Sequence, residues 1–426
     1  MDMKGAIAWL LLGLAVPVFA VGPPIYVHIV MHNEEGGGYH TNPPAFLRER
    51  SNLVEFAAML SSHGVMFNWQ PDWSFLRAVT NFDRGTPETG GTNVVVWLKN
   101  MGFEVDPHAH ESDTGQHSYA DVAFLMGQCG VTPSDIAGGF IAWPPTSSVL
   151  AHLSGTVTGW QYAAETWTPA VLWGGGTASH RDETNLWMSG IWRPKDTNSF
   201  TRHDDAAPVA HIGNFGGKQW RWLNLDRLVE LRGRGLLLTN RIYTCAIFAG
   251  QSELLPPFIV EFETNLLLRM TNSDLVWAGL AQTYQAWETT YGSEPNLFPF
   301  DGALDSDADG MPDGWEATNF WDLIASDGTN DYDGDSLNDL GEFIAGTRPA
   351  DTSSFFAAEI RSAAGATCAI SWPARSGNTY YLTSTTNLLA GRWLTNHAAS
   401  GIDGAQAYTD SPPVGSVMYR VRVTRP

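Results

Sequence analysis

Short, nearly uninterrupted apolar runs that end in polar or ionisable residues constrain the fold of this chain more than any other sequence feature. Residues 25–31 form the first run and are followed directly by His32 and Glu34, and a second run at 65–69 is followed by Asp72. Runs of this length without polar alternation are typical of strands that are buried on both faces, as in parallel sheets and α/β barrels. The beginning of the chain is therefore predicted to form a parallel sheet whose strands end in polar side chains.

Segments with helical spacing of their apolar residues separate these runs. Helices are predicted near 47–63, 73–79, 93–100, 119–129, 225–231, 261–269 and 280–287, and further strands at 103–106, 139–143, 170–174, 235–240 and 275–278. Six to eight strand–helix units follow one another in this way before about residue 300. This alternation predicts a parallel (β/α) barrel, distorted or incomplete, with its active site at the carboxyl ends of the strands.

The end of the predicted strand at 103–106 carries a candidate metal site. His108 and His110 are two residues apart, so in an extended chain their side chains point to the same face. Imidazole nitrogens and carboxylates are the usual ligands of divalent transition metals of the zinc type. His32, Glu34 and Glu35 follow the first strand and would reach the same edge of a barrel. A polar loop with incidental histidines is the alternative interpretation.

The region 301–354 differs sharply in charge from the rest of the chain. Residues 301–351 hold 14 acidic residues and a single arginine, whereas the whole chain has 45 acidic and 24 basic residues and a net charge of −21. Two segments, 305–316 and 331–342, match the twelve-residue calcium loop, with acids at positions 1, 3, 5, 9 and 12. Position 6, where the sharp turn needs a glycine, is Gly310 in the first loop and Ser336 in the second. The predicted calcium-binding residues are Asp305, Asp307, Asp309, Met311, Asp313, Glu316, Asp331, Asp333, Asp335, Leu337, Asp339 and Glu342. A repelling acidic linker is the alternative.

The two ends of the chain differ again in character. Residues 355–426 contain short alternating runs separated by turn residues, which predicts a small all-β sandwich. Residues 1–20 combine Lys4, an apolar run and the small residue Ala20 at the end, as in a cleaved secretory signal peptide. The acidic balance argues against nucleic acid as a partner.

The sequence thus predicts a secreted or cell-surface multidomain protein. Its predicted parts are a signal peptide at 1–20, an α/β barrel at 21–300, calcium-binding repeats at 301–354 and a β-sandwich at 355–426.

Three short motifs in the barrel region resemble the polysaccharide deacetylase superfamily. That family has paired carboxylates at the end of its first strand, where this chain has Asn33-Glu34-Glu35-Gly36. Its two metal-binding histidines, normally four apart, correspond to Asp106-Pro107-His108-Ala109-His110-Glu111, where the spacing is two. Its Arg-Pro element corresponds to Trp192-Arg193-Pro194, and Leu238-Thr239-Asn240 stands where the family has Leu-x-His.

This resemblance implies a metal-dependent carbohydrate esterase or deacetylase that acts on amide or ester bonds of carbohydrates with a metal-activated water. The implied site residues are Glu35, His108 and His110 as metal ligands, Glu34 as general base, Arg193 for the substrate or the oxyanion, and His32 and Asp106 as supporting residues.

The C-terminal regions carry two further resemblances. Segments 305–316 and 331–349 resemble the calcium repeats of secreted bacterial proteins, related to thrombospondin type 3 and dockerin-like repeats. Residues 355–426 are similar to the C-terminal β modules of secreted bacterial surface proteins. We interpret this module as an accessory domain, with contact to the cell surface, a protein or a carbohydrate as the alternative.

Two other functions are consistent with the sequence. The first is a glycoside hydrolase that uses two carboxylates across a cleft, drawn from Glu34, Glu35, Asp72 and Glu104. The second is a non-catalytic protein that binds carbohydrates or a surface. Tryptophans near the predicted strand ends are expected to pack in the core, with sugar stacking as the alternative role. They are Trp69, Trp73, Trp143 and Trp173.

Overall fold

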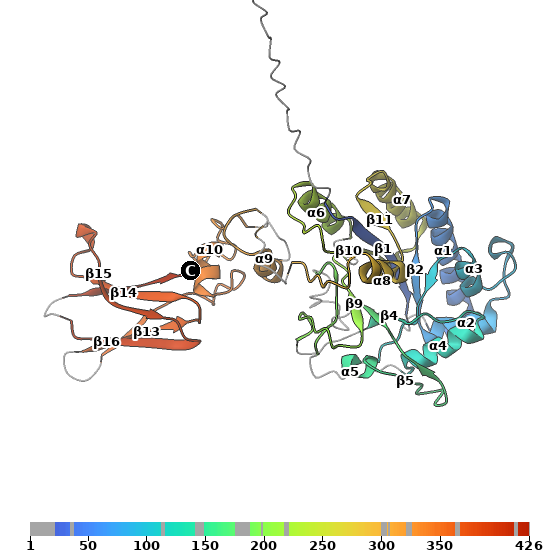
Figure 1. Cartoon of the computed structure of the whole chain (residues 1–426), viewed down its shortest axis with the longest axis horizontal. Coiled ribbons are helices and arrows are strands. Elements are labelled where there is room, and N and C mark those ends of the chain that lie inside the picture. The colour runs from blue at the N-terminus through green and yellow to red at the C-terminus, as the bar shows by residue number, and fades with distance from the viewer. Residues whose placement is uncertain are drawn as a thin grey trace, which may run out of the picture.

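The computed structural model describes residues 22–34, 38–111, 116–140, 149–174, 188–196, 199–216, 221–299, 305, 307–320, 326–362, 367–412 and 416–425. The predicted signal peptide, Glu35 and Trp143 lie outside these residues. Among the helices of the described part, none is long and apolar enough to span a membrane. Figure 1 shows the α/β elements of the first 290 residues in one body and the C-terminal strands in another.

A parallel sheet lies at the centre of the α/β body. Its central strand β1 (Ile25–Asn33) pairs along one side with β10 (Tyr243–Gly250). On its other side β1 pairs with β2 (Asn68–Pro71) near its carboxyl end and with β11 (Leu275–Trp277) near its amino end. The short strand β3 (Glu104–Val105) extends the sheet beyond β2. All of these pairs are parallel, which confirms the predicted parallel sheet.

A second sheet continues from the first. It has the order β4 (Ile136–Phe140), β7 (Val171–Gly174), β9 (Ala210–Ile212) and β8 (Ile191–Trp192), and only the β8–β9 pair is antiparallel. A parallel bridge between His108 and Gly138 links the chain after β3 to β4. The two sheets are therefore neighbours, and their closure into a barrel stays a prediction.

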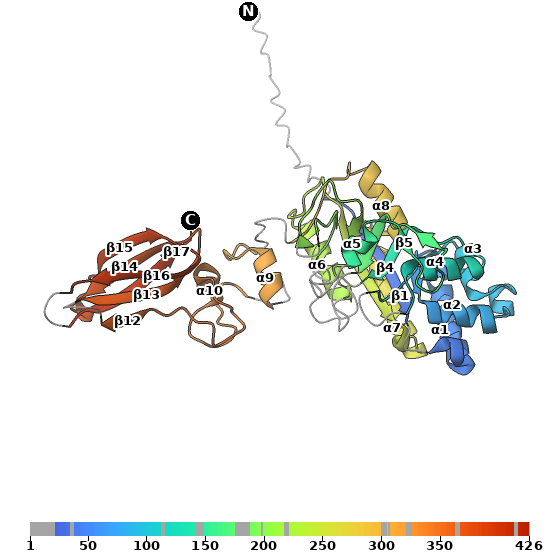
Figure 2. The ribbon, with the colours of Figure 1, turned by 90° about the horizontal axis from the view of Figure 1, so that it is seen from below.

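Helices surround these strands, as Figures 1 and 2 show. They are α1 (Pro43–Ser62), α2 (Trp73–Phe82), α3 (Val94–Asn100), α4 (Tyr119–Gln128), α5 (Val149–Leu153), α6 (Arg221–Gly233), α7 (Pro256–Met270) and α8 (Leu280–Thr289). A small hairpin, β5 (Val157–Thr158) and β6 (Thr166–Trp167), follows α5.

The first four of these helices each begin after a side chain that accepts a hydrogen bond from the first turn. These N-cap residues are Asn42, Asp72, Asn93 and Ser118. Such caps satisfy backbone N–H groups that have no partner within the helix.

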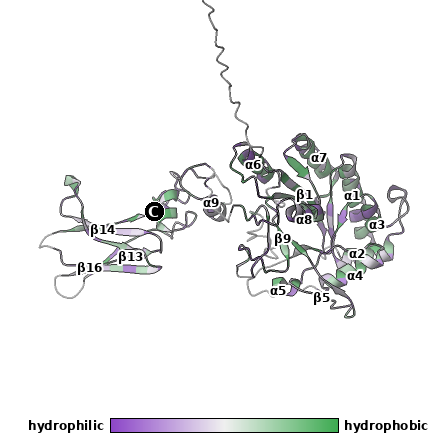
Figure 3. Cartoon of the chain, in the orientation of Figure 1, coloured by the Kyte–Doolittle hydropathy of each residue, from purple (hydrophilic) through white to green (hydrophobic). Residues whose placement is uncertain are grey.

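The structure corrects three predicted strands. The strand predicted at 139–143 forms at 136–140, and residues 141–143 lie outside the described residues. The second strand forms at 68–71 rather than 65–69, and its polar residues are buried, so hydrophilic strand segments lie inside the ring of helices (Figure 3). The strand predicted at 235–240 is a connection after α6, where Leu238 is 60% exposed. The next apolar run instead forms β10, because only that run pairs with β1 and becomes buried.

The C-terminal body consists of antiparallel sheets. One has the order β12 (Glu359–Ser362), β13 (Cys368–Ala374) and β16 (Gly404–Asp410), and the other has the order β15 (Leu394–Ser400), β14 (Thr379–Thr385) and β17 (Met418–Thr424). Ile370, Trp372 and Ala374 from the first sheet pack with Tyr380 and Leu382 from the second in one small cluster.

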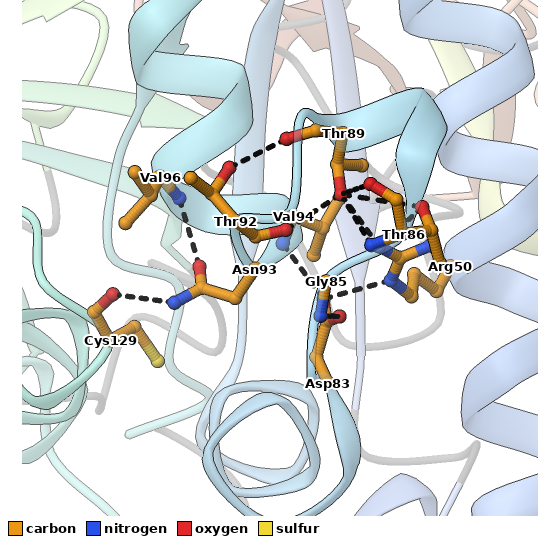
Figure 4. Close-up of polar contacts among 10 residues, drawn as sticks. All are labelled: Arg50, Asp83, Gly85, Thr86, Thr89, Thr92, Asn93, Val94, Val96 and Cys129. Carbon is orange, nitrogen blue, oxygen red and sulfur yellow. Dashed lines mark hydrogen bonds and ion pairs between the residues drawn. The ribbon is translucent and has the colours of Figure 1, made fainter.

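A buried ion pair holds the connection between α2 and α3 (Figure 4). Arg50 of α1 donates from Nε to Asp83 over 2.8 Å and from Nη2 to the hydroxyls of Thr86 and Thr89 over 3.3 and 3.2 Å. Asp83 also accepts the backbone N–H of Val94, the first residue of α3, over 2.8 Å. Since both charged side chains are buried, removing one leaves the other uncompensated.

We therefore expect Arg50→Met to lower the free energy of unfolding by about 3–5 kcal/mol, because Asp83 would remain buried without its cation. Arg234→Met is the control, since the ion pair of Arg234 with Glu230 joins side chains that are 42% and 50% exposed. Exposed pairs contribute about 0–1 kcal/mol. Urea unfolding followed by tryptophan fluorescence measures both variants. Equal losses of stability would contradict a structural role for the Arg50–Asp83 pair.

Candidate metal centre

Three side chains gather where β1 and β3 end. Nitrogen or oxygen atoms of His32, Glu34 and His108 all lie within 4.8 Å of one another. His32 is the second-last residue of β1, Glu34 directly follows β1, and His108 follows β3. Parallel strands bring these residues to one edge of the sheet, as the sequence predicted for the carboxyl ends of the strands.

His108 is held in one tautomer by the backbone of β4. Its Nδ1 lies 2.8 Å from the carbonyl oxygen of Gly138, which can only accept, so Nδ1 carries the proton. The Nε2 atom of His108 therefore carries a lone pair, which accepts a hydrogen bond from Nε2 of His110 over 2.9 Å. An ion bound to this nitrogen would take the place of that hydrogen bond. A ligand histidine commonly donates its other N–H to a carbonyl or carboxylate, which fixes the ring for metal binding.

His32 completes the group. Its ring stacks on His108 with 4.3 Å between centroids, and its Nδ1 lies 3.2 Å from Oε1 of Glu34. The Nε2 atom of His32 is buried and has no hydrogen-bond partner. Trp173 and Phe248 pack against the same ring edge to face. A buried nitrogen without a hydrogen-bond partner costs free energy of folding, and a bound cation would remove that cost. The geometry therefore fits a cation-binding site.

The electrostatics of the group favour an ionised Glu34 and a neutral His108. Burial raises the pKa of Glu34, but the hydrogen bond and charge of His32 and the charges of His108 and His110 outweigh it, so the net pKa is well below the usual value. Burial, with the neighbouring imidazoles, lowers the pKa of His108 well below its usual value. Metal ligands need this combination of ionised carboxylate and neutral imidazole.

Two glycines let the β4 backbone approach the group. Gly139 has a φ of +60°, and a Cβ atom there would lie 2.4 Å from Cε1 of His32 and 2.5 Å from Nδ1 of His108. A Cβ atom on Gly138 would lie 2.4 Å from Cδ of Gln70. Only glycine therefore fits between β4 and the histidine rings. The sequence held this signal as a Gly-Gly pair inside an apolar strand, but nothing in the sequence placed it beside His32.

Two other predicted site residues, Asp106 and Arg193, form their described hydrogen bonds with residues outside this group. Asp106 is buried and accepts hydrogen bonds from Asn68 and Ser134. Burial and the nearby charge of Glu104 raise the pKa of Asp106 to about 7. Arg193 donates to the carbonyl oxygens of Ala207 and Pro208, and its guanidinium lies 5.6 Å from the Trp287 ring centroid. Glu35 lies outside the described residues.

Two carboxylates of the glycosidase alternative cap helices. Asp72 accepts the N–H of Phe75 over 2.9 Å at the start of α2. Glu104 accepts the N–H groups of Leu280 and Ala281 over 2.6 and 3.0 Å at the start of α8. These bonds satisfy the unpaired N–H groups of helix ends, so both side chains have structural partners.

Tryptophans near the strand ends are packed rather than open for stacking. Trp69 and Trp173 are buried. The ring of Trp73 contacts His117 in a stacked arrangement at 4.2 Å and His40 in a tilted one at 4.6 Å. The described geometry therefore favours the packing role for these three rings.

The described residues of the two acidic loops share three features. Asp305, Asp307 and Asp309 bring carboxylate oxygens within 4.8 Å of one another, and Asp331, Asp333 and Asp335 do the same. In both loops the N–H of position 6 donates to the carboxylate of position 1, over 3.0 Å in the first and 2.9 Å in the second. Position 6 has a positive φ in each, +96° at Gly310 and +82° at Ser336. Short helices follow, α9 (Asp313–Phe320) and α10 (Asp339–Ala345).

The glutamate at position 12 of each loop is buried, and at least one of its carboxylate oxygens has no hydrogen-bond partner. Both carboxylate oxygens of Glu316 lack a hydrogen bond, as does Oε2 of Glu342. Burial, with repulsion from the neighbouring aspartates, raises the pKa of Glu316 to about 9 and of Glu342 to about 7. A buried carboxylate that faces other carboxylates is stabilised when a cation lies among them.

We predict that Gly139→Ala disrupts the metal centre, because the added Cβ atom would overlap both histidine rings and the residue has a left-handed φ. Zinc affinity, measured by calorimetric titration in excess calcium, is expected to fall by at least tenfold, the size of effect seen when the supports of metal ligands are disturbed. Gly127→Ala in α4 is the control, since a Cβ there would meet nothing within 4 Å. Unchanged zinc binding in Gly139→Ala would contradict the described packing.

No protein-family model matches this chain, and no curated protein matches it. Several solved structures are distantly similar, among them the following three. The allantoinase PuuE has 9% identity and a TM-score of 0.40 over 63% of this chain and 91% of its own. A 4-alpha-glucanotransferase from Thermococcus litoralis has 8% identity and a TM-score of 0.38 over 62% and 40%. A protein assigned as a polysaccharide deacetylase, from Mycobacterium smegmatis, has 9% identity and a TM-score of 0.36 over 65% and 94%. Similarity this weak does not assign the chain to a family.

Proposed function

We propose that the α/β body is a metal-dependent hydrolase that acts on acetylated carbohydrates, as an esterase or deacetylase. The observation that carries the proposal is the group of His32, Glu34 and His108, with its buried, unpartnered imidazole nitrogen. Two histidines and one glutamate form a ligand set that catalytic zinc sites use when they keep one position open. The deacetylase motifs in the sequence support the choice of carbohydrate amides and esters over other substrates.

The roles of the ligands differ from those expected on sequence alone. His32 and Glu34 stand with His108 in the group, so we assign these three to the ion. A bound ion of the zinc type would polarise a carbonyl group and lower the pKa of water towards ~7. His110 is half-buried, and its Nε2 lies 2.9 Å from Nε2 of His108. We assign His110 as the side chain that takes a proton during the reaction.

Single substitutions separate these roles in the full-length chain. His108→Ala is expected to lose the metal, whereas His110→Ala is expected to keep it and to lose acetate release by about 100-fold, the usual size of a general-base effect. Zinc per chain is measured by elemental analysis after dialysis in excess calcium, which keeps zinc from the acidic loops. Acetate release is measured on acetylated chitooligosaccharides and acetylxylan.

His63→Ala is the control, because His63 contacts Glu263 at the far end of α1. About one zinc ion per chain in the parent and His63→Ala, and none in His108→Ala, supports the proposal. A parent chain that binds no zinc would overturn it in favour of a carbohydrate-binding protein or a glycosidase.

We also propose that the two acidic loops bind Ca²⁺. The buried carboxylate oxygens without a partner, both of Glu316 and Oε2 of Glu342, carry this proposal, since position 12 of such loops normally supplies a bidentate ligand. The predicted leader at 1–20 would export this protein, and the loops would then act as structural elements between the two bodies. Their short helices and their contacts with the β body favour this structural role, because Asn378 donates to the carbonyl oxygen of Ile344 in α10 over 2.8 Å.

Ser336→Gly is expected to tighten calcium binding by the second loop. Ser336 has a φ of +82°, which costs a residue with a Cβ atom about 1–2 kcal/mol, partly offset by the greater freedom of glycine in the unfolded chain. The net gain of about 0.5–1 kcal/mol corresponds to about two- to fivefold in affinity. Calorimetric calcium titration measures the change.

Gly310→Ser is the reciprocal control, because it places a side chain at the same position of the first loop, where φ is +96°. It should weaken calcium binding there. Identical calcium affinities in all three chains would show that position 6 is not strained.

A further inference from the structure

The backbone that presents Glu34 is held by a side chain from the neighbouring strand. Gln251 directly follows β10, whose parallel register with β1 ends at the pair His32 and Gly250. Its Oε1 atom accepts the backbone N–H of Glu34 over 3.0 Å. Gln251 therefore reaches from the end of the adjacent strand β10 to the first residue after β1.

Two more donors converge on the same oxygen. The Tyr39 hydroxyl donates to Oε1 of Gln251 over 2.6 Å, and Nδ2 of Asn33 donates over 3.3 Å. Burial raises the pKa of Tyr39, so its hydroxyl keeps the proton that it donates. An amide oxygen has two lone pairs, so the three donors share them, and the contact from Asn33 at 3.3 Å is the longest. The position of this oxygen is thus fixed by three separate contacts.

The opposite side of the same peptide is tied to β2. Oδ1 of Asn33 accepts the indole N–H of Trp69 over 2.7 Å, and the carbonyl oxygen of Asn33 accepts the N–H of Asp72 over 2.9 Å. The end of β1 is therefore clamped between β2 on one side and Gln251 on the other. The clamp determines where the Glu34 carboxylate lies relative to His32, its neighbour at 3.2 Å.

We propose that Gln251 is a positioning residue of the metal centre, which holds Glu34 at the ligand position by accepting its backbone N–H. This inference rests on the proposed function, because Glu34 matters as a ligand only if the centre binds a metal. Metal ligands must lie within a few tenths of an ångström of their bonding distance, so a Glu34 backbone without this restraint would bind the ion more weakly. Partners of this kind typically contribute 10- to 100-fold in metal affinity.

Four variants of the full-length chain test the inference. Gln251→Met keeps the size of the side chain and removes the acceptor, whereas Gln251→Glu keeps an acceptor oxygen. Gln251→Asn keeps the amide but is one methylene too short to reach Glu34, and serves if the methionine variant does not fold. Gln282→Met, at an exposed position of α8, is the matched control. Zinc dissociation constants are measured by calorimetry in excess calcium, together with the melting temperature of each zinc-free protein.

We expect Gln251→Met and Gln251→Asn to bind zinc 10- to 100-fold more weakly, while Gln251→Glu and Gln282→Met bind it about as tightly as the parent. Zinc affinity that is unchanged in Gln251→Met overturns the inference alone, even if the melting temperature falls, because the role is then only structural. Equal losses in Gln251→Glu and Gln251→Met also overturn it, since the acceptor would not matter. A parent chain without zinc affinity overturns the proposed function, and this inference with it.

Discussion

The parallel pairing of β1 along both of its sides is the constraint on which the α/β body depends. Because β10 pairs with β1 over nearly its whole length, and β2 pairs with it at the carboxyl end, the strand has no exposed edge where it meets the site. The residues at its end, His32 and Glu34, are held at fixed positions as a result. The bridge from His108 to Gly138 then brings β4 to the same place.

Buried polar groups divide into two kinds among the described residues. Most buried carboxylates in the α/β body accept several hydrogen bonds, as Asp121 does from the N–H groups of residues 118 and 160–162. Buried atoms without a partner include Nε2 of His32, both carboxylate oxygens of Glu316 and Oε2 of Glu342, and also Nδ1 of His28 in the core. An unpaired buried group costs free energy, and the cations proposed above would supply the missing partner where other ligand-type side chains converge on it. The same physical criterion thus supports both proposals, one with imidazole ligands and the other with carboxylate ligands.

Much of this arrangement was predictable from local patterns. The apolar runs predicted the parallel sheet, and the polar residues that follow them predicted which edge carries the site. The predicted strand at 235–240 was wrong. A second apolar run follows at 243–250, and pairing with β1 decides which of the two runs becomes a strand. Prediction also missed Gly139 and Gln251, since their roles depend on strands that are distant in the sequence.

Local periodicity and turn chemistry are sufficient to predict the mixed α/β character, the acidic loops and the polar ends of the strands. Which of the ionisable residues meet depends on contacts between distant segments. His32 and Glu34 lie next to His108 because separate strands end side by side, whereas Asp106 and Arg193 have other partners. The order of strands in a sheet depends on long-range packing, which no local pattern encodes.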